Sequence, residues 1–195
     1  MSEDAVIEYA AWGELFFEQA VTVERVLAGV NVLADRPIDV GPLGVGPGRL
    51  AKVHARGRIG TATGERVGLM PVTFEVALPV SLHFVLDLGM DKQRFDADVV
   101  VPLRLTAHGR SDLAIVLEVT PPTAQQVAVD LRAQGLRASI TQAAAGIDGE
   151  LRRFIARFVA KEVEKPEVAA ARVIDVGAAL ARAASGVVPR RTPEA

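Results

Sequence analysis

Residues 72–88 read VTFEVALPVSLHFVLDL, with an apolar side chain at every even position. The odd positions carry mostly smaller or polar side chains, including Glu75, Ser81, His83 and Asp87. Successive side chains of a strand point to opposite faces, so this alternation predicts a strand with one apolar face. The pattern lasts 17 residues, whereas a mean strand has about 5–6, so the apolar strip is on the order of 55 Å long. A strip of this length has to be covered.

The composition favours a globular protein with a large core. Of the 195 residues, 50% are hydrophobic, and the formal net charge is −2. A nucleic-acid-binding protein is disfavoured because it would be expected to carry a strong basic balance. The chain has no cysteine, which excludes disulfides and thiolate metal sites. We predict a single domain over residues 1–185, followed by a flexible tail over 186–195.

The start of the chain predicts a cytoplasmic location. Ser2, Glu3 and Asp4 place no positive charge ahead of the first apolar residues, unlike a secretory signal. No uninterrupted apolar run reaches the ~18 residues that a membrane span needs. We therefore expect no transmembrane segment.

Residues 4–34 contain no proline and predict one long helix. Apolar side chains cover most of its circumference, which is typical of a buried helix. At the helical rise per residue it would be about 45 Å long, comparable with the apolar strip of residues 72–88. The simplest arrangement lays this helix along that strip.

Two further strand patterns flank the central one. Residues 41–48 are rich in glycine and proline and predict a connection. Residues 49–60 alternate and predict a strand with a basic outer face. Residues 95–107 carry apolar side chains at odd positions and predict the second long strand of a hairpin with residues 72–88.

Aligning the two apolar faces sets an expected register for this hairpin. The predicted opposite pairs are Leu88 with Phe95, Asp87 with Asp96, Leu82 with Val101, Ser81 with Pro102 and Pro79 with Arg104. Proline lacks a ladder donor and collects at edges and bulges. The two prolines therefore predict a bend halfway along the hairpin that curls the sheet.

The remainder of the chain passes from strands to helices. Residues 112–119 and 127–140 alternate, with a change of phase at Gly135. From Thr141 the period becomes helical, and Pro166 ends that helix. Residues 167–185 are rich in alanine and predict a mostly helical segment, with an irregular break at residues 172–175 left open.

No catalytic, metal or cofactor site is predicted. His54, His83 and His108 all take polar-face positions, and none has a metal-ligating partner at a suitable spacing. Asp96 and Asp98 share one strand face, but neighbouring cations favour a solubilising role over acid–base chemistry. The chain contains neither GxSxG nor HExxH. We expect a protein that is not an enzyme.

Two basic faces leave two interpretations open: each is exposed to solvent, or each contacts an anionic membrane. They comprise Lys52, Arg56 and Arg58 on the strand over residues 49–60, and Arg153, Arg157 and Lys161 on the helix that begins at Thr141. Interspersed glutamates on that helix favour a solvated face.

These elements predict an α+β fold: a long N-terminal helix wrapped by a highly curved antiparallel sheet, with C-terminal helices. The order of elements, with VTFEVALPVSLHFVLDL and RFDADVVVPLRLTA (residues 94–107), resembles the tubular lipid-binding superfamily. That superfamily includes bactericidal/permeability-increasing protein-like domains and synaptotagmin-like mitochondrial lipid-binding domains. The resemblance implies that acyl chains are held between helix and sheet.

Two functions are left open by the sequence. The first is non-catalytic binding of a lipid, a fatty-acid-like molecule or another elongated apolar ligand in a channel between helix and sheet. The expected lining is Phe16, Phe17, Phe74, Val76, Leu82, Phe84, Val99, Val101, Leu103, Ile115 and Leu117. The alternative is a structural or protein-interaction module, either a homodimer or a partner-binding protein, with a filled core and no ligand.

Overall fold

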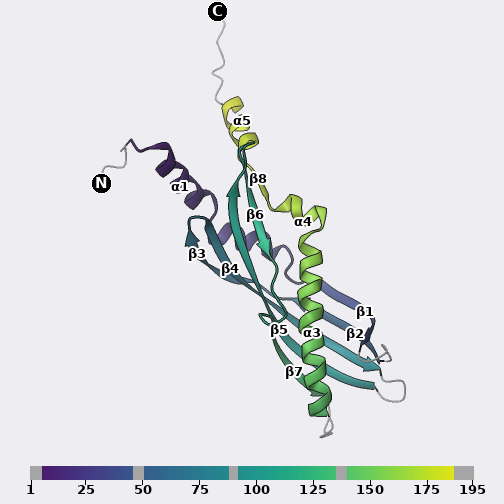
Figure 1. Ribbon diagram of the computed structural model, residues 1–195. Helices are drawn as coiled ribbons and strands as arrows, with labels where there is room; N and C mark the ends of the chain where they lie inside the picture. Colours follow the sequence, from purple (N-terminus) through teal and green to yellow (C-terminus); the bar gives the residue numbers. More distant parts are fainter. Residues whose placement is uncertain (1–5, 46–50, 88–91, 135–139, 187–195) are drawn as a thin grey trace, which may run out of the picture.

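The structure is a computed structural model that describes residues 6–45, 51–87, 92–134 and 140–186 (Figure 1). These residues form an α+β fold with a strongly curled antiparallel sheet, as the sequence predicts. The strands are β1 (Pro37–Val45), β2 (Ala51–Ile59), β3 (Thr63–Leu69), β4 (Val72–Asp87), β5 (Lys92–Gly109), β6 (Ala114–Thr120), β7 (Ala128–Gln134) and β8 (Val173–Asp175). The helices are α1 (Tyr9–Ala20), α2 (Val23–Asn31), α3 (Ile140–Val163), α4 (Pro166–Ala171) and α5 (Val176–Gly186).

The centre of the sheet is the ribbon formed by β4 and β5. These strands pair without a register shift from Thr73 opposite Thr106 to Asp87 opposite Lys92. The even residues of β4 and the odd residues of β5 supply most of the buried core. The long apolar strip that the alternation predicts therefore exists and is covered.

β4 and β5 each pair with two different strands on their outer edges, and both change partner at the same position along the ribbon. β3 pairs with residues 72–77 of β4, and β2 pairs with residues 80–87. On the other side, β7 pairs with residues 94–100 of β5, and β6 pairs with residues 104–109. Pro79 and Pro102 fall in the two gaps, and we call this level the junction. It divides the sheet into an upper half with β3, β6 and β8 and a lower half with β1, β2 and β7 (Figure 1).

The two prolines leave the hydrogen bonds of the central ribbon intact. The N–H of Gly60 donates to the carbonyl of Pro79 at 2.8 Å, so the backbone nitrogen and oxygen of Pro79 face away from β5. Ala77 lies two residues before Pro79, so its backbone N–H and C=O also point away from β5. Its partner on β5 is Pro102. The nitrogen of Pro102 therefore also points outward. The missing N–H groups lie where neighbouring strands end, not inside the β4–β5 ladder.

The expected register of the hairpin is wrong, although its faces are right. Leu82 lies opposite Ala97 instead of Val101, a shift of four residues. Pro79 lies opposite Val100, and Pro102 opposite Ala77. The expected pair of Leu88 with Phe95 falls partly outside the described residues, and Phe95 pairs with Phe84.

The charges on the outer face explain this register. The expected alignment would set Asp87 opposite Asp96, and like charges opposite each other are unfavourable. The observed alignment sets Asp87 opposite Lys92 and His83 opposite Asp96. The alternation of apolar residues fixes which face is buried, but it is compatible with both alignments. The charges on the outer face favour the observed alignment.

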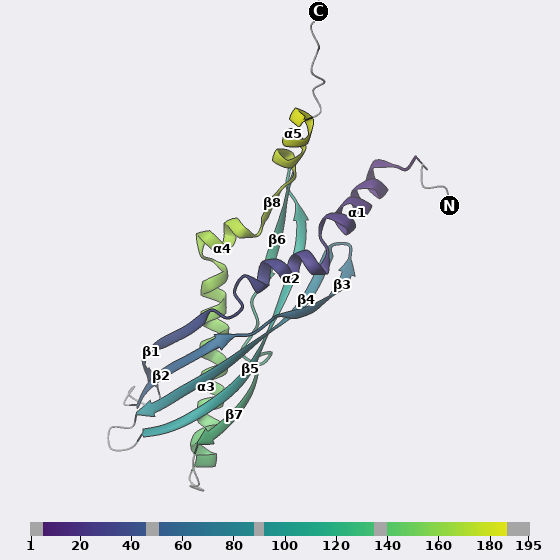
Figure 2. The same ribbon diagram turned by 180° about the vertical axis from the view of Figure 1, so that it is seen from behind.

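Helices cover the two halves of the apolar face. Seen from opposite sides, α2 crosses the sheet near β3, whereas α3 runs along the lower half beside β7 (Figures 1 and 2). Because strands twist along their length, one continuous apolar face serves both helices. Val21 and Val26 from the N-terminal segment and Ile155 from α3 belong to the same buried cluster.

The predicted single helix over residues 4–34 is wrong, because α1 ends at Ala20 and α2 begins at Val23. Thr22 adopts an extended conformation, and its side chain accepts a hydrogen bond from the N–H of Arg25 at 3.3 Å. A threonine at this position is a favourable N-cap. The break turns Val21 into the core, where its exposed fraction is 1%.

Two arginines stabilise this break by binding the carbonyls of the last residues of α1, which have no partner within the helix, and the carbonyl of Val21 just after it. The guanidinium of Arg25 donates to the carbonyls of Gln19 (3.1 Å) and Ala20 (2.9 Å). Arg66 of β3 donates to the carbonyls of Glu18 (3.0 Å) and Val21 (2.8 Å). Arg66 thereby joins the end of α1 to the sheet.

Smaller differences concern the ends of the chain. Residues 41–45, expected in a connection, belong to edge strand β1, which tolerates proline because its pairing is irregular between Val40 and Leu43. Strand β8 separates α4 from α5 at residues 172–175, where the sequence leaves an irregular break open. Apart from Gly186, the last residue of α5, the predicted tail lies outside the described residues, as does the phase change at Gly135.

We expect Val21→Ala to lower the free energy of unfolding by about 2 kcal/mol, because it removes buried methyl groups and leaves a cavity. Urea denaturation followed by circular dichroism measures this effect. Val32→Ala is the control, because Val32 is 65% exposed and its loss should change stability by no more than about 0.5 kcal/mol. Equal effects of the two substitutions would contradict the anchoring role of Val21.

Candidate functional site

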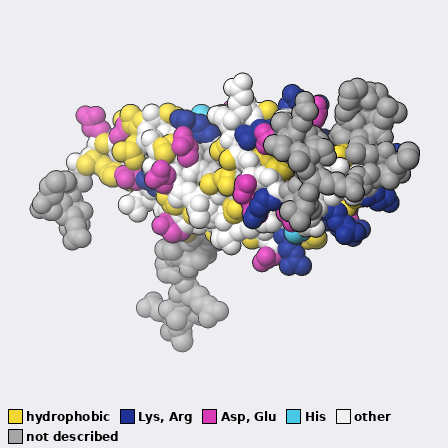
Figure 3. Space-filling view, turned by 90° about the horizontal axis from the view of Figure 1, so that it is seen from below, with side chains coloured by type: hydrophobic (Ala, Val, Ile, Leu, Met, Phe, Trp, Pro, Cys, Tyr) yellow, Lys and Arg dark blue, Asp and Glu magenta, His cyan; other side chains and the backbone are white. Residues whose placement is uncertain are grey.

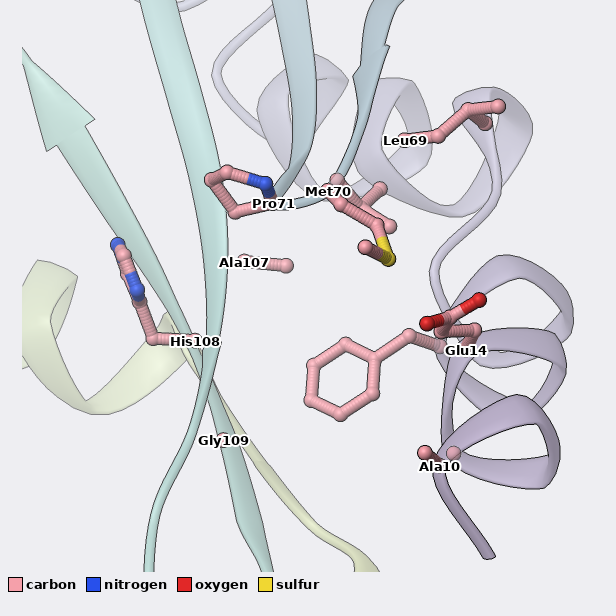
Figure 4. A pocket seen from close by; sticks show the side chains of 11 residues that line it. Ala10, Glu14, Leu69, Met70, Pro71, Ala107, His108 and Gly109 are labelled. Atoms are coloured by element: carbon pink, nitrogen blue, oxygen red, sulfur yellow. The ribbon is translucent and has the colours of Figure 1, made fainter. Parts of the chain in front are cut away.

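A hollow of about 380 Å³ lies between α1 and the upper half of the sheet (Figure 4). Three segments line it: the sheet-facing side of α1, the turn between β3 and β4, and the end of β5. The lining residues are Ala10, Gly13, Glu14, Phe17, Leu69, Met70, Pro71, Val72, Ala107, His108 and Gly109. This volume is near the lower end of the ~300–1,000 Å³ typical of ligand pockets.

The hollow exists because two of the four α1 residues that line it, Ala10 and Gly13, have little or no side chain. Ala10, Gly13, Glu14 and Phe17 follow the spacing that places residues on one helix face. A Cβ added at Gly13 would meet no heavy atom within 4 Å. Ala10 and Gly13 therefore leave open the space that larger side chains would fill.

The floor of the hollow is the upper end of the core. Val72 and Ala107 are buried members of the central cluster and also line the hollow. Phe17 closes one side, and a Cβ added at Gly109 would lie 3.2 Å from Cζ of the Phe17 ring. Glycine at this position thus permits close approach of the ring. An apolar group entering the hollow would contact the same surface that the core residues form.

The large apolar side chains of α1 are mostly exposed. No residue of α1 is buried, and Tyr9 and Trp12 are 94% and 57% exposed. Trp12 stacks on Phe16 with ring centroids 5.4 Å apart. The helix that the sequence predicts as a buried rod therefore rests on the rim of the sheet, with small residues inward.

The residues predicted to line a channel mostly form the packed core. Phe74, Val76, Leu82, Phe84, Val99, Val101 and Ile115 are buried, and Phe16, Phe17, Leu103 and Leu117 are half-buried against them. Of these residues, Phe17 alone lines the hollow beneath α1. Sequence reasoning missed the remaining lining, although the recurrence of Ala10, Gly13 and Phe17 on one helix face would have indicated it.

A second hollow, of about 290 Å³, lies on the polar face of the lower half. Most of its side chains belong to rows of residues that lie opposite one another on neighbouring strands. One row holds Asp39, Arg56, His83, Asp96 and Arg132 on β1, β2, β4, β5 and β7. Asp39 pairs with Arg56, His83 contacts Asp96, and Arg132 pairs with the neighbouring Asp98. This face neutralises its own charges, which favours a solvated surface over a reaction centre.

The histidines and aspartates of this face have partners that the sequence analysis missed because its register was wrong. His83 Nδ1 contacts Asp96 Oδ1, and Asp96 Oδ2 accepts a hydrogen bond from Gln134. On the upper half, His108 Nε2 lies 2.9 Å from Glu118 Oε2. Within the described segments, no group of three or more histidine, aspartate or glutamate side chains is placed to hold a metal ion.

The basic faces lie away from the hollow beneath α1. Figure 3 shows Lys and Arg side chains gathered on the right, the side of β1 and β2 in Figure 1, whereas hydrophobic and acidic side chains gather on the left, the side of α1. On α3, Arg153 pairs with Glu150 at 2.7 Å, and the Nε–H of Arg157 donates to the carbonyl of Arg153 at 3.2 Å. Part of the helical basic face is thus already engaged within the protein.

Comparisons with protein-family models, with curated proteins and with solved structures find no match to this chain. In the part of the chain that the structure describes, no helix is long and apolar enough to cross a membrane.

Two hydrogen bonds lower the pKa of Asp96 from its ordinary value. The one from Gln134 has the larger effect, and the one with His83 has the next largest. We expect Gln134→Ala to raise this pKa, and Arg132→Gln to raise it less because Arg132 acts only through its charge. Carboxyl-carbon NMR titration measures both variants.

The sign of the pH dependence follows from linkage. A carboxyl group with a lowered folded-state pKa stabilises the protein above its unfolded-state pKa and loses this effect as the pH falls through the folded value. The difference in stability between wild type and Gln134→Ala should therefore shrink as the pH falls. A titration of Asp96 that is unchanged in Gln134→Ala would contradict the assignment.

Proposed function

We propose that this protein binds an elongated apolar ligand, such as a lipid or lipid-like amphiphile, in the hollow beneath α1. The binding is non-catalytic. The observation that carries the proposal is an open space beside two small residues of α1, Ala10 and Gly13, which line the same hollow as the buried residues Val72 and Ala107. Ligand pockets are mostly apolar and concave, and this hollow has both properties.

The proposal differs in place from the channel predicted from the sequence. Along most of the ribbon, side chains of the protein itself pack on the apolar face, so a ligand would enter at the upper end only. A curled antiparallel sheet with helices on its apolar face supports the resemblance to the tubular lipid-binding superfamily. Membership of that superfamily remains a proposal, and so does a cytoplasmic location.

We expect Gly13→Leu to lower the affinity for an apolar probe about tenfold, because the new side chain occupies the hollow and removes contacts of about two methylene groups. Fluorescence titration with Nile red measures the affinity. Loss of binding would not reflect a weakened helix, since leucine is a better helix former than glycine.

Gly29→Leu is the matched control. Gly29 lies in α2, and a Cβ there also meets no heavy atom within 4 Å, but Gly29 does not line the hollow. This variant should bind the probe like the wild type. If the wild type takes up no apolar probe, or if both leucine variants bind equally well, the proposed site is wrong.

A second candidate function is a protein-interaction module, and the exposed apolar side of α1 favours it. Tyr9, Trp12 and Leu15 are exposed on a helix that buries none of its residues. A homodimer or a partner protein that packs on α1 would cover them.

If this second function is correct, we expect light scattering to show a dimer at micromolar concentration. Trp12 is the only tryptophan of the chain, so its emission should shift to shorter wavelength on dimerisation. Trp12→Ser should give a monomer, whereas Val32→Ser, which changes an exposed valine outside α1, should not. A wild-type protein that remains monomeric would exclude the homodimer.

A further inference from the structure

We infer that the hollow beneath α1 selects amphiphiles with an ammonium or hydroxyl head group over those with a carboxylate. The inference rests on the proposed function and specifies its ligand class. It differs from the expectation of a fatty-acid-like ligand, because the charge at the mouth of the hollow has the same sign as a fatty acid.

Glu14 is the acidic residue that lines the hollow. Figure 4 shows its carboxylate between α1 and the β3–β4 turn, on the side of the helix that faces Met70. Glu14 is exposed, so it lies at the opening rather than at the floor. An apolar tail that reaches Val72 and Ala107 would leave its polar end near this carboxylate.

No described residue neutralises Glu14. Glu18 lies one helical turn further on and pairs with Arg66 at 3.5 Å, whereas no described residue forms a hydrogen bond or ion pair with Glu14. The guanidinium of Arg66 also binds two carbonyls at the end of α1. Arg66 is therefore already committed to Glu18 and to the helix break.

The other charged groups near the hollow do not supply a free cation. Figure 4 places the imidazole of His108 on the opposite side of β5 from Glu14, and Glu118 pairs with it at 2.9 Å. Arg110, just beyond the lining, binds Asp112. A carboxylate head group would thus meet Glu14 without compensation, whereas an ammonium or hydroxyl group could donate a hydrogen bond to it.

The preference is measured with three amphiphiles of twelve carbons each: dodecylammonium, dodecanol and dodecanoate. Each is titrated below its critical micelle concentration to displace Nile red from the wild-type protein. We expect the ammonium to bind about two- to fivefold more tightly than the carboxylate, the range of an exposed ion pair, with the alcohol between them. Added salt should reduce the difference because it screens exposed charges.

Glu14→Gln should bring the ratio of the two affinities close to one while the alcohol binds as in the wild type. Glu8→Gln is the matched control, because Glu8 precedes the same helix but does not line the hollow, and it should keep the wild-type ratio. Equal or tighter binding of dodecanoate by the wild type, or a ratio unchanged in Glu14→Gln, would overturn the inference. Failure of all three amphiphiles to bind would instead reject the proposed function itself.

Discussion

The structure depends on covering one apolar face, that of the β4–β5 ribbon. Two paired strands with no register shift present valine, leucine, phenylalanine and alanine side chains on one side over most of their length. A two-stranded ribbon of this kind is not stable by itself in water, so other elements have to pack on it. α3 covers the lower half and the segment around Val21 covers the upper half, and both contribute to one cluster.

The two ends of this face are covered differently. At the lower half, Ile155 of α3 is buried and Leu151, Phe154 and Val159 pack against the same core. At the upper half, the anchor is Val21 in the break between two helices, and α1 beyond it buries no residue. Arg66 holds the end of α1 through two carbonyls. α1 is thus fixed at its C-terminal end, and the rest of the helix lies over the hollow without filling it.

The sequence analysis identified the long strands β4 and β5 and their apolar face because alternation over many residues has few alternative explanations, but it missed β3, which is short and carries no such pattern. It failed on the N-terminal helix because periodicity alone does not show a break; the information lies in Thr22, which caps a new helix, and in Arg66, which is distant in sequence. The register failed for a similar reason, since the apolar pattern is unchanged by a shift of four residues. The hollow could not be predicted from apolar residues, because small residues on one side of α1 create it.

The positions of Pro79 and Pro102 also bear on how this protein avoids unwanted association. At the junction, β2 gives way to β3 and β7 to β6, so the flanks of the ribbon would otherwise present free N–H groups to another chain. Proline has no such donor, and the outward carbonyl of Pro79 is already bound by Gly60. A foreign strand approaching this gap in the β4 flank finds neither a donor at Pro79 nor a free carbonyl there, and exposed edges that offer both are what lead sheets to aggregate. The residues that interrupt the sheet therefore also protect it from forming intermolecular sheets.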